Sequence, residues 1–189
     1  AFFSSDNISS RLAVALGLIY FLPVIIARAI QIFWPPVIGI MEIEKPRFFS
    51  WWIIFQLEML FSRISILEEM LRIIPGLYSF WLRCWGAKIG RLTFWSPGVR
   101  IFDRPWLNIG DDVLLGAGVR ISAHVYYRKP NGELEFLLAP VQVENNTVVG
   151  GYSILGPGSS IAAGETTEAC LLLPPYTRFE NGKRIKTHD

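Results

Sequence analysis

A six-residue repeat runs through residues 143–173, which read VENNTVVGGYSILGPGSSIAAGETTEACLLL. Every sixth residue of this stretch, starting from Val143, is large and apolar except Thr167. The same spacing occurs upstream and continues downstream, at Ile89, Trp95 and Ile101, at Ile109, Leu115 and Ile121, and at Phe179 and Ile185. A helix repeats about every 3.6 residues and a strand about every two, so a period of six belongs to neither alone. It predicts short strands joined by tight turns, three to a coil, stacked into a triangular prism with the apolar positions inside.

The phase of the repeat breaks at two places. Two extra residues stand near Pro105-Trp106, and the step from Ile121 to Val143 is 22 residues where six would keep the phase. The surplus is expected to leave the prism as a loop at about residues 126–142. The loop should turn at Asn131-Gly132, a dipeptide typical of two-residue hairpin turns. Long excursions from a regular scaffold often carry function, and a trimer-stabilising arm is the alternative.

The composition excludes several classes of protein. Of the 189 residues, 51% are hydrophobic and 18% are charged, which argues against a disordered chain. Two cysteines, Cys84 and Cys170, are too few for a disulfide scaffold. A net charge of +2 without a densely basic stretch argues against a nucleic-acid partner. The excess of apolar residues calls for a lipid-facing segment, a large partner interface, or both.

The apolar excess lies in the first half of the chain, and we expect residues 1–85 to form a membrane-associated helical region. Leu12–Phe33 is 22 residues, about 33 Å as a helix, which is enough to cross a bilayer core. A second segment, Trp51–Ile74, has the pattern of an amphipathic helix that lies in the membrane interface or packs on a neighbouring domain. Arg28 and the prolines leave a re-entrant segment open beside a full span. A buried helical layer of a soluble oligomer is the alternative, and the absence of an initial Met leaves an upstream piece open.

Three stretches carry the local signature of the repeat: Ile109-Gly-Asp-Asp-Val-Leu-Leu-Gly, Gly118-Val-Arg-Ile-Ser-Ala-His124 and Val149-Gly-Gly-Tyr-Ser-Ile-Leu-Gly-Pro-Gly158. They resemble the hexapeptide-repeat acyltransferases, most closely the sugar and exopolysaccharide O-acetyltransferases of that family. The resemblance covers about residues 86–186, and it implies a mainly β fold with a left-handed parallel β-helix domain over residues 86–189. The apolar helical region that precedes this domain is not part of the family's common pattern. It also implies a homotrimer and acetyl-CoA or another acyl-CoA as co-substrate.

His124 is the main candidate for a catalytic residue. Acyl transfer to a hydroxyl group needs a base, and imidazole titrates near neutral pH. The sequence has one other histidine, His188, next to the last residue, and His124 lies where the predicted loop begins. Two histidines are too few for the three-histidine zinc site of the carbonic anhydrases that share this fold, so no metal is expected. The sequence also lacks a Gly-x-Ser-x-Gly elbow and a P-loop.

The register and the resemblance suggest further site residues. Stacking places Arg104 one coil before His124 and Gly158 one coil after it, so Arg104 could hold an acid, a phosphate or Asp103. We expect substrate binding at Ser96, Asp103, Arg104 and Tyr126. Ser96 stands where the family often has an asparagine. By resemblance, coenzyme A would lie in a groove between adjacent subunits, on Gly151, Gly158, Ala169, Lys183 and Lys186. A solvated terminus is the alternative for the two lysines.

Together these patterns predict a membrane-attached, coenzyme A-dependent O-acyltransferase that modifies a cell-envelope glycan or a lipid-linked sugar. Supply of coenzyme A, together with Lys45 and Arg47 after the apolar segment, favours a catalytic domain facing the cytoplasm. Two alternatives stay open. One is an acyltransferase of the same fold with a longer acyl chain or a lipid or amino-acid acceptor, which would need an apolar tunnel near residues 81–106. The other is a non-catalytic scaffold of a membrane assembly.

Overall fold

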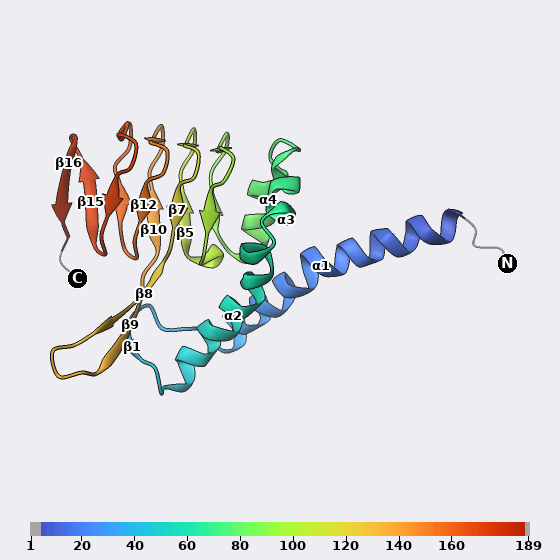
Figure 1. Ribbon diagram of the computed structural model, residues 1–189, viewed down its shortest axis with the longest axis horizontal. Helices are drawn as coiled ribbons and strands as arrows, with labels where there is room; N and C mark the ends of the chain where they lie inside the picture. The colour runs from blue at the N-terminus through green and yellow to red at the C-terminus, as the bar shows by residue number, and fades with distance from the viewer. Residues whose placement is uncertain (1–4, 188–189) are drawn as a thin grey trace.

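A computed structural model describes residues 5–187 of the chain, and its C-terminal half is a three-sided prism of short strands (Figure 1). The first side holds β2 (Lys88–Ile89), β5 (Leu107–Ile109), β10 (Val141–Val143), β13 (Ser160–Ile161), β15 (Thr177–Glu180) and β16 (Lys183–Lys186). The second side holds β3 (Phe94–Trp95), β6 (Leu114–Leu115) and β11 (Val148–Val149). The third side holds β4 (Arg100–Ile101), β7 (Arg120–Ile121), β12 (Ile154–Leu155) and β14 (Leu172–Leu173). The chain visits the three sides in this order, coil after coil.

The strand pairing confirms the coils that the repeat predicts. On the first side, Ile109 and Ile161 flank Val143 in parallel register. Leu155 likewise pairs with Ile121 and Leu173 on the third side. The anchor side chains from Ile89 to Phe179 fill the interior of the prism and are buried, except Trp95, which is partly buried. The two extra residues near Pro105-Trp106 form a single 3₁₀ turn, η1 (Arg104–Trp106).

Glycine follows several anchors because the next coil lies too close for a side chain. A Cβ atom at Gly150 would lie 2.2 Å from the carbonyl oxygen of Glu168, far inside van der Waals contact. The repeat ends one step earlier than the sequence predicts. Asn181 and Gly182 both have positive φ, and this tight turn reverses the chain so that β16 pairs antiparallel to β15. Ile185 is therefore 46% exposed on an edge strand, and its predicted inward position is wrong.

The loop excursion is a β-hairpin that stands away from the prism. β8 (His124–Arg128) and β9 (Leu134–Leu138) pair antiparallel, and β10 rejoins the prism at Val141. The turn contains Asn131-Gly132, as predicted, but five residues separate the strands and only Gly132 has a positive φ. A strand from the first half of the chain, β1 (Gly39–Glu42), adds to the hairpin beside β9.

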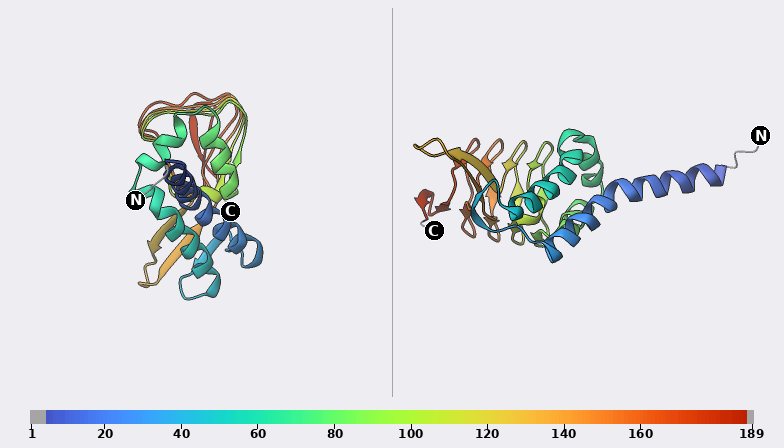
Figure 2. Two further views of the ribbon diagram at one scale, coloured as in Figure 1. Left: turned by 90° about the vertical axis from the view of Figure 1, so that its right-hand side faces the viewer. Right: turned by 90° about the horizontal axis from the view of Figure 1, so that it is seen from below.

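Helices cover the N-terminal end of the prism, as the end-on view shows (Figure 2). They are α1 (Ser5–Phe33), α2 (Pro46–Arg63), α3 (Ile66–Arg72) and α4 (Leu77–Trp85). The predicted helix Trp51–Ile74 is two helices, because the chain leaves helical geometry at Ile64. Helices occupy more of the described chain than strands do, so "mainly β" describes the C-terminal half alone.

One hydrophobic core continues from the helices into the first coils of the prism. Trp81 and Trp85 are almost fully buried and pack against Phe61. The second half of α1 joins this core: the indole N–H of Trp81 donates to the carbonyl oxygen of Tyr20, 3.1 Å away. The first half of α1 projects away from the body (Figure 1). Residues Ile8–Phe33 form the single helix in the described part of the chain that is long and apolar enough to cross a membrane.

Candidate active site

His124 and Asp103 form a hydrogen-bonded pair at the corner where the chain leaves the third side of the prism. The Nδ1 atom of His124 lies 2.7 Å from Oδ2 of Asp103 and 2.9 Å from Oδ1. β7 and the start of β8 place the histidine, and the turn before η1 places the aspartate. Because a carboxylate accepts hydrogen bonds, Nδ1 carries the proton and Nε2 is the ring nitrogen left for a substrate. The imidazole side chain is 15% exposed, whereas Asp103 is 1% exposed.

The Asp103 carboxylate is held by further donors. The indole N–H of Trp51 donates to Oδ1 over 3.0 Å, and the backbone N–H of Ala123 donates to Oδ2 over 2.8 Å. The hydroxyl group of Ser122 donates to Oδ2 over 3.3 Å. These bonds fix the direction of the buried carboxylate. The arrangement is the carboxylate–imidazole pairing that orients a histidine base in acyl-transfer enzymes.

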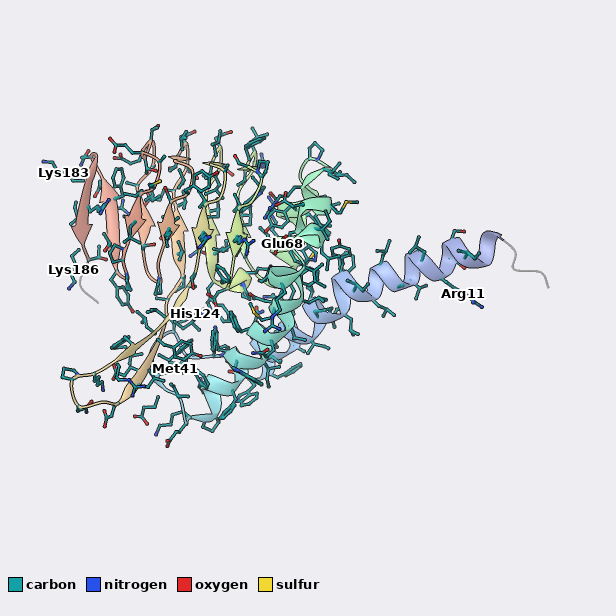
Figure 3. All side chains as sticks on the ribbon, in the orientation of Figure 1. Arg11, Met41, Glu68, His124, Lys183 and Lys186 are labelled. Atoms are coloured by element: carbon teal, nitrogen blue, oxygen red, sulfur yellow. The ribbon has the colours of Figure 1, made fainter. Side chains whose placement is uncertain are left out.

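Aromatic side chains enclose the imidazole ring. The ring centroid of His124 lies 4.8 Å from that of Trp51, 5.0 Å from Phe55 and 5.8 Å from Phe136, which is stacked on it. Tyr126 stands at the edge, 6.1 Å away and 42% exposed. Trp51 and Phe55 come from α2, so the helical half of the chain forms one wall of the site. Figure 3 shows His124 between the hairpin and this helix.

Arg104 does not take part in this site, contrary to the sequence-based expectation. Its side chain is completely buried and turns away from the histidine into the helical layer. There it pairs with Glu58, 3.2 Å away, and with Glu68. Burial raises the pKa of the Glu58 carboxyl group, and the Arg104 guanidinium opposes that rise. Arg104 is therefore unavailable to a substrate. It fastens η1, and with it the neighbouring Asp103, to α2 and α3.

Gly158 also differs from the expectation, since its neighbour in the preceding coil is Ala139. The hairpin inserts between His124 and the returning chain, and the N–H of Gly158 donates to the carbonyl oxygen of Ala139 over 3.1 Å. A Cβ atom at Gly158 would lie 2.6 Å from the ring of Tyr176. The glycine thus makes room for a tyrosine in the next coil rather than for a substrate beside the histidine.

The other residues predicted for the site lie at places on the prism away from His124. Ser96, Gly151 and Ala169 all stand between the second and third sides, whereas His124 stands between the third and first. Lys183 and Lys186 lie on β16, at the far end of the first side (Figure 3). Lys186 lines a pocket of about 480 Å³ together with residues of the hairpin root and the last coil, Ile40, Val125, Tyr127, Leu137, Pro175, Tyr176 and Thr187. His188 falls outside the described residues.

The sequence-based prediction missed several residues that build the site. Trp51, Phe55 and Phe136 wall the histidine, and Ser122 and Ala123 hold its carboxylate partner. For Trp51 and Phe55 the sequence predicts only an amphipathic helix, because the helical period does not show which of its faces contacts an aspartate far away in the chain. Within residues 5–187, no group of three or more His, Cys, Asp and Glu side chains could hold a metal ion.

Solved structures similar to this chain are hexapeptide-repeat acetyltransferases. One is a hexapeptide-repeat-containing acetyltransferase from Vibrio cholerae complexed with acetyl-CoA, 15% identical, with a TM-score of 0.43, covering 69% of this chain and 86% of that one. A maltose O-acetyltransferase from Clostridium difficile 630 is 16% identical, with a TM-score of 0.43, over 80% of this chain and 94% of that one. A galactoside acetyltransferase in complex with coenzyme A is 16% identical, with a TM-score of 0.37, over 64% and 76%. No protein-family model and no curated protein matches the sequence.

Proposed function

We propose that this chain is a coenzyme A-dependent O-acyltransferase in which His124 is the general base. The observation that carries the proposal is the pairing of His124 with the buried Asp103, which leaves Nε2 for an acceptor at the root of the hairpin. Nε2 takes the proton of an acceptor hydroxyl group while that oxygen attacks the thioester carbonyl carbon. The new C–O bond forms, the C–S bond breaks, and the imidazolium returns its proton to the leaving thiolate. The products are an ester and the free thiol.

The proposal includes a trimer, because in a single chain the proposed base and the residues predicted to bind coenzyme A lie at two different corners of the prism. His124 lies at one corner, and Gly151 and Ala169 lie at another. A threefold arrangement would bring the corner with Gly151 and Ala169 in one chain against the corner with His124 in its neighbour. Acyl-CoA would then lie between subunits, with Lys183 and Lys186 near its phosphates.

The proposed acceptor is a cell-envelope glycan or a lipid-linked sugar, reached by a chain held at the membrane. Its support is α1, whose residues Ile8–Phe33 have a mean hydropathy of 2.2 in their most apolar window. Only 11% of that window is buried in the protein, which leaves its side chains for lipid. We propose that the catalytic half faces the cytoplasm, where acyl-CoA is made.

The aromatic wall also supports a second candidate, transfer of a longer acyl chain or use of a more apolar acceptor. Trp51, Phe55 and Phe136 present apolar surface beside the imidazole ring. The tunnel that this alternative predicted near residues 81–106 has less support, because Trp81 and Trp85 are packed in the core. Comparing kcat/KM for acetyl-CoA with that for longer acyl-CoA thioesters separates the two candidates. A steady rise with chain length would favour the second.

Replacing Asp103 with asparagine is expected to lower kcat by roughly 10²-fold or more, because an amide no longer selects the Nδ1-protonated tautomer. Trp51→Phe removes one donor to the same carboxylate, keeps the aromatic wall, and should give a smaller loss. Rates measured from pH 5 to pH 9 test this. An unchanged profile in Asp103→Asn would mean that the pair does not act in catalysis.

The full chain is expected to sediment with membranes and to resist extraction at alkaline pH. Changing Leu16 and Leu18 to arginine should release it, since each arginine at a helix centre costs roughly 2.5–3.5 kcal/mol on insertion. Both leucines are exposed on the projecting part of α1, 46% and 54%. Tyr152→Arg, at a prism corner 68% exposed, is the matched control that should stay with the membrane. Recovery of the unchanged chain in the soluble fraction would remove the membrane part of the proposal.

A further inference from the structure

Helix α3 turns the charged side chains of Glu68 and Arg72 inward, together with Leu67 and Leu71, and exposes apolar side chains on its outer face. Glu68 is 5% exposed, and the Arg72 side chain is 7% exposed. Around them, the outward positions of the helix and its flanks are apolar and exposed, between 47% and 69%: Ile64, Ile66, Met70, Ile73 and Ile74. A surface helix of a water-soluble protein has the opposite arrangement. The outer face of α3 therefore fits an apolar neighbour better than water.

The inward charges explain why this orientation cannot reverse. Glu68 pairs with Arg104, and Arg72 donates to the carbonyl oxygen of Val99 over 2.7 Å. Glu69 accepts a hydrogen bond from the N–H of Gly98 over 3.1 Å. These bonds attach α3 to the first coil of the prism, where Figure 3 shows Glu68 at the junction. Rotating the helix to bury its isoleucines would break the ion pairs of Glu68 and Arg72. The apolar face therefore points outward.

The exposed charged side chains nearest this face are basic, since Arg63 precedes Ile64 and Arg100 lines a pocket with Glu69 and Arg72. Between residues 48 and 110, the exposed ionisable side chains are Arg63, Arg83, Lys88, Arg91 and Arg100. The acidic residues of the same range, Glu58, Glu68 and Asp103, are buried, and Glu69 is half-buried and paired with Arg72. Asp111 and Asp112 are exposed just after this range, and the Asp111 carboxylate accepts a hydrogen bond from the N–H of Arg91. The basic side chains beside the apolar face itself, Arg63 and Arg100, are complementary to anionic lipid headgroups above a hydrocarbon layer.

The helical cap also lies at the end of the prism from which α1 projects (Figures 1 and 2). We infer that the outer face of α3, with the turn after it, rests on an anionic bilayer surface as a second membrane contact beside α1. The prism then stands with its helical end on the membrane. His124 belongs to the second coil, and coils are spaced by about 4.8 Å, so the site lies close above the lipid surface. The inferred contact between α3 and lipid does not depend on the proposed acyl transfer. Its consequence that the acceptor is reached near the membrane surface rests on the proposed function.

Site-specific fluorescence quenching tests the contact on the full chain. Cys84 and Cys170 are changed to serine, and an environment-sensitive label is placed on Ile74→Cys. The protein is reconstituted into vesicles of phosphatidylcholine and phosphatidylglycerol that carry a lipid-bound quencher. Leu16→Cys on α1 is the positive control. Leu172→Cys, 49% exposed on β14 near the other end of the prism, is the matched negative control.

The label at position 74 should be quenched several-fold more than the label at position 172. The difference should shrink when phosphatidylglycerol is left out. Equal quenching at positions 74 and 172, with position 16 strongly quenched, would overturn the contact while leaving α1 as an anchor. A change in the fluorescence of the label at position 74 that depends on protein concentration and not on the lipid-bound quencher would also overturn the contact. A second copy of the chain would then cover this face. Acyl transfer by the same samples is measured separately, so loss of activity cannot be mistaken for loss of the contact.

Discussion

Replacing His124 with alanine is expected to lower kcat/KM for acyl transfer by roughly 10²–10⁴-fold, the usual contribution of a positioned general base. His124 is the one histidine within residues 5–187, and its Nδ1 atom lies beside the Asp103 carboxylate. The protein should stay folded, because the Asp103 carboxylate keeps its bonds from Trp51 and Ala123. Release of free thiol from acetyl-CoA in the presence of an oligosaccharide acceptor measures the rate.

The control for this substitution is Lys88→Ala, at an exposed position of β2 that is not among the residues around the histidine. Its rate should match that of the unchanged protein. Mass spectrometry of envelope glycans and lipids gives the same test in cells: His124→Ala should remove an acyl group from one species. An unchanged profile, with the protein present at its normal level, would contradict the enzyme proposal and favour a scaffold.

Replacing Arg104 with methionine is expected to lower the free energy of unfolding by roughly 3–5 kcal/mol, the cost of removing one partner from a buried ion pair. Methionine fills much of the same space, but Glu58 would lose the guanidinium group that it pairs with, and Glu68 would keep only Arg72 as an ion-pair partner. Denaturant unfolding followed by circular dichroism measures the change. Catalysis should fall as well, since η1 holds the neighbouring Asp103 in place.

The same variant has an informative rescue. Adding Glu58→Gln to Arg104→Met removes the buried carboxyl group that has lost its ion-pair partner, and part of the lost stability should return. The single variant Arg100→Met, an exposed arginine on β4, is the matched control and should change stability by less than about 0.5 kcal/mol. If Arg104→Met proved as stable as the unchanged protein, the buried network would not be what fastens the helices to the prism.

The sequence alone determined the prism and its coils. A column such as Ile109, Val143 and Ile161 follows from spacing, because each residue meets its equivalent one coil away and the same rule repeats. The place of the hairpin follows in the same way, since residues in excess of the period have no room in a coil. His124 was identifiable because it stands at that exit from the repeat. The spacing of a repeat therefore predicts which residues contact each other in neighbouring coils.

Only the tertiary structure decided how the helical half meets the prism. Trp51 and Asp103 are 52 residues apart, and Glu58 and Arg104 are 46 apart, with no period to relate them. Asp103 and Arg104 are adjacent in the chain, yet one turns to the histidine and the other into the helical core. The break between α2 and α3 and the outward isoleucines are equally unpredictable from helical spacing. The reason is physical: buried charges must be paired, and the partner that satisfies each one is set by packing between distant segments rather than by local sequence.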